Sequence, residues 1–286
     1  MSDAKIHLGS SSFTASGWQG AFYPKGLKSS DYLSFYSEHF DTVEVDSTFY
    51  GCPTSRTVNN WNLKTPQGFV FSVKAPQSIT HDKVLVNCDA EIKEFLDTIS
   101  ILGEKLGPIV FQFPYFDNSQ MRDAFAFTDR LIPFLNKLPK NYRFAVEIRN
   151  RKWLDAELAD LLRTLKIALV LQDIRSMPGP QELKFDPVTA DWTYIRWLGD
   201  RKGIEAVTQT WDRIVEDKTA RLSSWVDYCQ RIQRRGVKQY IYANNHYEGF
   251  SVATVEKFRN IWRGRGFPEL DKPLRIRPKE PSLFER

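Results

Sequence analysis

Eight short runs of strand-forming residues recur along this chain, and most of them are followed by a stretch whose apolar residues repeat at helical spacing. The runs are residues 6–11, 42–47, 69–75, 108–114, 143–149, 167–173, 193–198 and 239–245. Helical spacing is clearest in residues 92–106, 222–232 and 252–262. Regular alternation of strand and helix predicts an α/β protein with a parallel sheet and helical crossovers. Eight such units favour a closed, TIM-like (β/α)8 barrel over an open doubly wound sheet.

The segments between the runs refine this prediction without dividing the chain. Residues 174–192 show no helical pattern, so the sixth crossover is expected to be irregular. The stretch GSSSFTASGWQG after the first run lacks the GxGxxG turn of dinucleotide-binding folds. A length of 286 residues is ordinary for one barrel. We therefore predict a single domain with its core at about residues 6–264, followed by a basic, proline-containing tail at residues 265–286.

The second run, TVEVDS, shows how the strands sort their side chains. Val43 and Val45 alternate with Glu44 and Asp46. In a parallel barrel the outer face of each strand packs against helices and is apolar, whereas the inner face leads to the site at the C-terminal ends of the strands. Glu44 and Asp46 are therefore expected to point inward. The same sorting on five other strands gives the inward residues Lys74, Gln112, Glu147, Arg149, Arg196, Tyr242 and Asn244.

This convergence places three carboxylates beside three cations in one small volume, which suits acid–base chemistry. Glu44, Asp46 and Glu147 are the predicted catalytic carboxylates, and one of them is expected to have a displaced pKa suited to proton transfer. Which of them acts as acid and which as base stays open. His81, on the loop after the third strand, is a further candidate because imidazole titrates near neutral pH.

The cations of the same volume predict an anionic ligand. Lys74 offers a point charge, and Arg149 and Arg196 offer planar forks suited to phosphate or carboxylate. The other predicted ligand-binding residues are Gln112, Asn244 and Asn245 as polar contacts, and Tyr50, Trp18 and Trp153 as aromatic walls.

Neither a metal nor a cofactor is predicted. The chain has only four histidines and no HExxH spacing, and its three cysteines form no CxxC pair. Mg²⁺ on Glu44, Asp46 or Glu147 is the remaining option, and the neighbouring cations argue against it. The dispersed cysteines and the lack of an apolar segment of membrane-spanning length predict a reduced, cytoplasmic protein without membrane association. No sequence feature specifies an oligomeric state.

Several motifs occur together in the order typical of one family. They are GSSSFTASGWQGAFYP (9–24), TVEVDSTFYGCPT (42–54), FVFSVKAPQSITHDK (69–83), LGPIVFQFP (106–114), FAVEIRNRKW (144–153), YIRWLGD (194–200) and YANNHYEGF (242–250). Through them the chain resembles the YecE-like family, the domain of unknown function family numbered 72, over about residues 6–262. The resemblance implies a TIM-like barrel and supplies no reaction. Family members often read Arg-x-His-Gly on the seventh strand, whereas this chain has Arg196-Trp197-Leu198-Gly199, so no role is assigned to a histidine there.

The leading interpretation is an enzyme, a hydrolase or isomerase, that acts on an anionic, phosphorylated or sugar-like small molecule. One alternative is a nucleic-acid-associated binding or processing protein, which the net charge of +5 and the aromatic residues would allow. Another is a noncatalytic barrel whose ion pairs only stabilise the lumen. A steep fall of affinity with salt would distinguish nucleic-acid binding from binding of a small anion.

Overall fold

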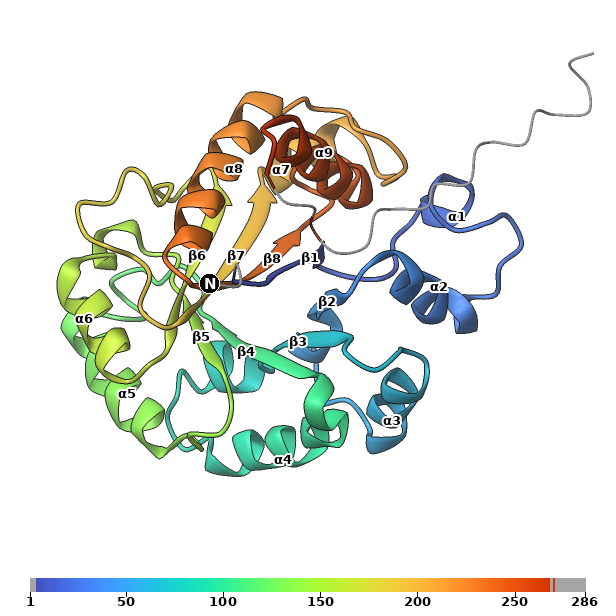
Figure 1. Cartoon of the computed structure of the whole chain (residues 1–286). Helices are drawn as coiled ribbons and strands as arrows, with labels where there is room; N and C mark the ends of the chain where they lie inside the picture. The colour runs from blue at the N-terminus through green and yellow to red at the C-terminus, as the bar shows by residue number, and fades with distance from the viewer. Residues whose placement is uncertain (1–3, 268–269, 271–286) are drawn as a thin grey trace, which may run out of the picture.

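Residues 4–267 and residue 270 are described in a computed structural model, and they form a nearly closed barrel of eight parallel strands (Figure 1). The strand order is β1-β8-β7-β6-β5-β4-β3-β2. The strands are β1 (Ile6–Ser10), β2 (Thr42–Val45), β3 (Val70–Lys74), β4 (Leu106–Gln112), β5 (Phe144–Glu147), β6 (Ala168–Ile174), β7 (Trp192–Gly199) and β8 (Lys238–Ala243). The predicted barrel is therefore confirmed, and each strand overlaps the run that predicted it.

Helices surround the strands and follow most of them in the chain (Figure 1). They are α1 (Trp18–Ala21), α2 (Tyr32–His39), α3 (Ser55–Leu63), α4 (Asp89–Ile99), α5 (Ala124–Lys137), α6 (Ala156–Thr164), α7 (Arg201–Val207), α8 (Thr219–Arg234) and α9 (Ser251–Gly264). Short 3₁₀ turns are η1 (Ser29–Asp31), η2 (Asp46–Phe49), η4 (Ser100–Lys105) and η5 (Arg151–Trp153), and η3 (Ser78–Asp82) is a π turn. The described chain forms no helix between Ile174 and Trp192, which confirms the irregular sixth crossover.

The start of several helices follows from a side-chain cap at a fixed position. Asp123 accepts a hydrogen bond from the backbone N–H of Ala126, and Asp155 accepts one from that of Leu158. A carboxylate in this position pairs an N–H group that has no partner within the helix, and it opposes the positive end of the helix dipole. These two caps fix where α5 and α6 begin, after the connecting segments 113–123 and 148–155 that follow β4 and β5.

Two separate apolar layers confirm the inward and outward sorting of the strands. The layer between strands and helices contains Val43, Phe71, Phe111, Val146, Leu169, Leu171, Ile195 and Ile241. The layer that fills the lumen contains Val110, Ala145, Val170, Tyr194, Tyr240 and Tyr242. β6 is too uniformly apolar for its two faces to be told apart from sequence. In the structure Leu169 and Leu171 face the helices and Val170 faces the lumen. The lumen below the carboxylates is a packed core, as expected for an eight-stranded barrel.

The barrel has a seam between β1 and β2. Among the described residues β1 forms a ladder with β8 and β2 forms one with β3, but β1 and β2 form none with each other. The strands still approach closely, since a Cβ atom at Gly9 would lie 2.3 Å from the Thr42 carbonyl oxygen. The buried Tyr36 hydroxyl bridges the seam: it accepts from the Ser10 N–H at 3.0 Å and donates to the Thr42 carbonyl at 3.2 Å. One side chain of α2 thus replaces part of the missing ladder.

Replacing Tyr36 with Phe is expected to lower the free energy of unfolding by about 1–3 kcal/mol, because it leaves a buried backbone donor and acceptor unpaired. Urea unfolding of the variant beside wild type measures the difference. Tyr115→Phe is the control, since Tyr115 is 67% exposed. A loss for Tyr36→Phe no larger than that of the control would contradict a bridging role.

The end of the chain is described only in part. α9 ends at Gly264, and the ring of Phe267 packs edge-on against Trp262. The remainder of the predicted tail, residues 268–269 and 271–286, lies outside the described residues. In the described part of the chain, no helix combines the length and the hydrophobicity that crossing a bilayer requires.

Candidate functional site

Arg196 on β7 is the centre of a buried ion cluster at the C-terminal end of the strands. The residue is 2% exposed. Its Nη2 atom lies 2.8 Å from Glu44 Oε1 on β2, and its Nη1 atom lies 2.8 Å from Glu147 Oε2 on β5. Nη2 also lies 3.2 Å from Asp46 Oδ1. Two carboxylates from the end of β2 and one from the distant β5 therefore meet on one guanidinium, which is the convergence that the sorting of the strands predicts.

Glu147 is held as a carboxylate. It is fully buried, and its Oε1 atom accepts from Arg149 Nε at 2.7 Å while its Oε2 atom faces Arg196. Burial by itself raises the pKa of Glu147, but the charges of Arg149 and Arg196 outweigh it and lower the pKa to about 2. Burial also opposes the charge of Arg196, yet Glu44, Glu147 and Asp46 together raise its pKa well above the usual value. Glu147 and Arg196 therefore form an ion pair that stays fully charged at neutral pH.

Asp46 behaves differently from the other two carboxylates. Desolvation, followed by the negative charge of Glu44, raises its pKa from 3.8 to about 6, and Arg196 and Lys74 only partly oppose this. The side chain is nevertheless 32% exposed, whereas those of Glu44 and Glu147 are buried. Asp46 is thus a carboxyl group that solvent reaches and that titrates near neutral pH.

Lys74, at the end of β3, lies in the same cluster and has a different kind of partner. Its Nζ atom is 3.7 Å from the centre of the Phe49 ring, in cation–π geometry. The imidazole ring of His81 lies 4.9 Å from the Phe49 ring. Its Nδ1 atom lies 2.8 Å from Thr80 Oγ1. Burial and the charge of Lys74 lower the pKa of His81. His81 is therefore a neutral neighbour of the cluster at neutral pH.

A layer of hydroxyl groups supports the cluster from the lumen. Tyr194 on β7 donates to Glu44 Oε2 at 2.5 Å. Deeper in the lumen the Tyr242 hydroxyl lies 2.7 Å from both Thr42 Oγ1 and Ser72 Oγ. Burial raises the pKa of both tyrosines well above the usual value, so they remain protonated. Tyr194 was not among the predicted site residues, although its position two residues before Arg196 places it on the same inner face.

The predicted carboxamides have other partners. Gln112 lies opposite Glu147 in the β4–β5 ladder, and its Nε2 donates to the Phe113 carbonyl at 3.1 Å. Asn244 accepts from the N–H of His246, and Asn245 accepts from the N–H and hydroxyl of Ser251 at the start of α9. The Oδ1 atoms of the two asparagines therefore shape the turn between β8 and α9.

The structure corrects two of the predicted aromatic walls, Trp18 and Trp153. Trp18 is 1% exposed and packs among Phe22, Tyr23 and Phe250, so it belongs to the core. Trp153 stacks on Phe116 and Phe127 and contributes to a groove between α5 and α6. Tyr50 follows η2 and is 76% exposed, and it contacts Phe49 edge-on. Loops place these rings by packing interactions that the sequence pattern does not reveal.

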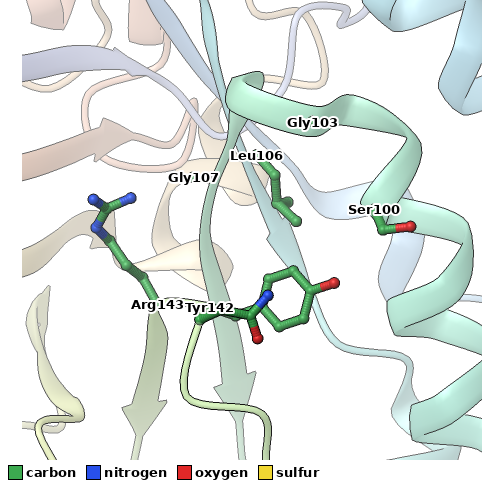
Figure 2. A pocket seen from close by; sticks show the side chains of 7 residues that line it. Ser100, Gly103, Leu106, Gly107, Tyr142 and Arg143 are labelled. Atoms are coloured by element: carbon green, nitrogen blue, oxygen red, sulfur yellow. The ribbon is translucent and has the colours of Figure 1, made fainter.

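Two cavities lie away from the ion cluster. One, of about 270 Å³, lies at the N-terminal end of β4 and β5 (Figure 2). Glu147 lies at the other end of β5. Its lining residues are Ser100, Gly103, Leu106, Gly107, Asn141, Tyr142 and Arg143. The other, of about 250 Å³, lies between α5 and α6 and includes Phe125, Trp153 and Leu158. Within residues 4–267 and 270, no three His, Cys, Asp or Glu side chains form a group that could hold a metal ion.

Comparison with known proteins agrees with this architecture. A family model described as "Protein of unknown function DUF72" matches residues 7–275. The chain is 32% identical to the UPF0759 protein YecE of Escherichia coli K12 over 122 residues, which are 41% of each chain. It is 31% identical to the UPF0759 protein YunF of Bacillus subtilis over 147 residues, 48% of this chain and 50% of YunF. The chain thus aligns with about half or less of the length of these curated relatives.

Solved structures extend the similarity over the whole barrel. A DUF72 family protein from Thermotoga maritima is 27% identical, with a TM-score of 0.70, covering 91% of this chain and 99% of that one. A D-psicose 3-epimerase from Clostridium cellulolyticum H10 is 11% identical, with a TM-score of 0.54, covering 90% of this chain and 92% of that one. At this level of identity the likeness to the epimerase is one of fold alone.

Proposed function

The chain belongs to the DUF72 family, whose description states no reaction, and we propose that it is an enzyme using acid–base chemistry at the C-terminal mouth of its barrel. Its substrate is a small anionic molecule, phosphorylated or sugar-like, and the reaction is a hydrolysis or an isomerisation. The observation that carries this proposal is the contrast between Asp46 and Glu147, which touch the same guanidinium but have pKa values of about 6 and about 2. Two carboxyl groups whose pKa values are driven apart by their surroundings are typical of acid–base sites.

In this proposal Asp46 exchanges the proton, since a group that titrates near the working pH is the most effective acid or base. Glu44, Glu147 and Arg196 form a rigid support that sets the field around Asp46. Substrate enters from the solvent-exposed side of Asp46 and Arg149, whose side chains are 32% and 18% exposed. Lys74 adds the one cation of the cluster that no carboxylate neutralises directly within the described part of the chain.

The charge of the cluster favours an anion at low pH. Three carboxylates and three cations sum to zero when all are ionised, and protonation of Asp46 leaves the cluster with a charge of +1. Anion binding is therefore expected to strengthen as pH falls through about 6. The sign is opposite for a cationic ligand, which would bind better above this pH.

The two alternatives account for less of the site. A purely structural ion network explains Arg196 and Glu147, but it requires neither an exposed carboxyl group of raised pKa nor a lysine without an ion pair. A nucleic-acid site needs several cations free to contact phosphates. Here Arg196 is occupied by three carboxylates and Arg149 by Glu147, so few positive charges of the mouth remain for a polyanion.

The titration of Asp46 tests this proposal without a known substrate. We expect its carboxyl carbon, followed by ¹³C NMR, to titrate near pH 6 in wild type. In Glu44→Gln the pKa is expected to fall toward 3.8, because the neighbouring negative charge is removed. Glu157→Gln, on the exposed surface of α6, serves as the control and leaves the titration unchanged. A wild-type pKa near 4 would remove Asp46 from the proposed chemistry.

A further inference from the structure

Lys74 is a buried amine that the other charged groups of the site leave without a salt bridge. The residue is 8% exposed, and within the described part of the chain its Nζ atom forms neither an ion pair nor a hydrogen bond. Its neighbour Arg196, in contrast, binds three carboxylates. A lysine needed only for charge balance would be expected to pair with one of these carboxylates, because an unpaired buried ammonium is costly.

The short turn η2 (Asp46–Phe49) holds Lys74 through both its backbone and its amine. Val45 pairs with Val73 at the end of the β2–β3 ladder, so Asp46 and Lys74 both come one residue after the last pair of this ladder. Thr48 fixes the backbone of Lys74, since its hydroxyl donates to the Lys74 carbonyl at 2.7 Å and accepts from the Lys74 N–H at 3.2 Å. Phe49 supplies the ring below Nζ.

This arrangement holds the amine without blocking its lone pair. A cation–π contact stabilises the ammonium form only weakly compared with a carboxylate, and it leaves the nitrogen free to react once a proton is lost. Burial, with a smaller contribution from Arg196, lowers the pKa of Lys74, whereas the three carboxylates oppose this effect. Desolvation next to another cation is the usual way in which a lysine becomes a nucleophile.

From this geometry we propose that Lys74 is a nucleophile that forms an imine with the carbonyl carbon of the substrate, which is therefore a small anionic aldehyde or ketone. This inference rests on the proposed function and deepens it, since Asp46 is the partner acid. An iminium ion retains the positive charge of the lysine, so the cluster keeps its charge balance while the substrate is bound. It also acidifies the neighbouring C–H group of the substrate, as an isomerisation requires.

The reaction balances with the groups of the site. The ammonium of Lys74 transfers one proton to the Asp46 carboxylate, and the neutral amine adds to the carbonyl carbon as the C=O π bond breaks. A second proton moves from nitrogen to the alkoxide oxygen, which gives a carbinolamine. Asp46 then returns its proton to the hydroxyl group, the C–O bond breaks, and water leaves. The net change is one ammonium and one carbonyl compound giving one iminium ion and one water.

Reductive trapping tests this proposal on the full chain. The protein is incubated with dihydroxyacetone phosphate or pyruvate in the presence of sodium cyanoborohydride, and the modified lysine is identified by peptide mass spectrometry. We expect an adduct at Lys74 that forms at least about tenfold faster than at any other lysine, and roughly 10²-fold more slowly in Asp46→Asn. Lys74→Arg keeps a cation above Phe49 but cannot form an imine, so this adduct is absent.

Lys105 provides a matched internal control. Burial lowers its pKa as well, but its Nζ donates to the Asn62 carbonyl at 2.6 Å and to the Thr65 carbonyl at 2.7 Å. Modification of Lys74 no faster than of Lys105 by both probes would overturn the imine. The titration of Asp46 distinguishes this failure from that of the proposed function, because an Asp46 pKa near 6 without trapping leaves the acid–base site intact.

Discussion

Replacing Asp46 with Asn is expected to lower turnover by about 10²–10⁴-fold, the usual contribution of a general acid or base. Asn has nearly the same shape and can still accept from Arg196, so the loss arises from the missing proton and not from altered packing. A mass-spectrometric screen of phosphorylated sugars, sugar acids and small keto acids with wild type supplies the substrate, and kcat is then compared between the two proteins. Asp129→Asn, on the exposed side of α5, is the matched control.

The same variant has a characteristic effect on stability. The folded-state pKa of Asp46 is raised from 3.8 to about 6, so the stabilising effect of its protonated form is complete below pH 3.8 and is lost as pH rises through about 6. Asn cannot ionise, and Asp46→Asn is therefore expected to unfold at a higher temperature than wild type at pH 7.5, with a smaller advantage at pH 5. Full activity in this variant, or a large loss of stability, would refute the assigned role.

Replacing Arg196 with Met is expected to lower the free energy of unfolding by about 3–5 kcal/mol at pH 7, because it leaves the buried carboxylates of Glu44 and Glu147 without their shared partner. Urea unfolding measures this loss, since urea, unlike guanidinium chloride, does not screen charges. Arg130→Met on the exposed surface of α5 is the control, with an expected change within about 0.5 kcal/mol.

The pH dependence and a double variant distinguish lost charge pairing from lost packing. In wild type the pKa of Glu147 is lowered from 4.5 to about 2, so its stabilising contribution is present above 4.5 and is lost as pH falls through about 2. In Arg196→Met a buried carboxylate that has lost its partner takes up a proton at higher pH than in wild type. The difference in the free energy of unfolding between the variant and wild type is therefore expected to be smaller at pH 4 than at pH 7. Adding Glu147→Gln to the variant is expected to recover part of the lost stability. A difference of the same size at both pH values would indicate that lost packing, and not lost charge pairing, destabilises the variant.

The inner residues of the site were predictable because the alternation of apolar and polar residues along a strand shows which side chains face inward. The alternation on β2 and β5 identifies Glu44 and Glu147 as inward, and no knowledge of distant contacts is needed for that step. The same rule would have found Tyr194, which shares the inner face of β7 with Arg196. It does not apply to Trp18 and Trp153, because these rings lie on connecting segments where no periodicity indicates the direction of a side chain.

The sequence by itself determined the barrel, its irregular sixth crossover and the polar groups that face its mouth, since strand period and helix period are local properties of the chain. Only the tertiary structure decided which of these groups pair. Arg196 occupies Glu44 and Glu147, while η2 turns back to place Phe49 beneath Lys74. The separation of the Asp46 and Glu147 pKa values depends on the same contacts, because electrostatic effects follow distances and burial among residues that lie far apart in the sequence.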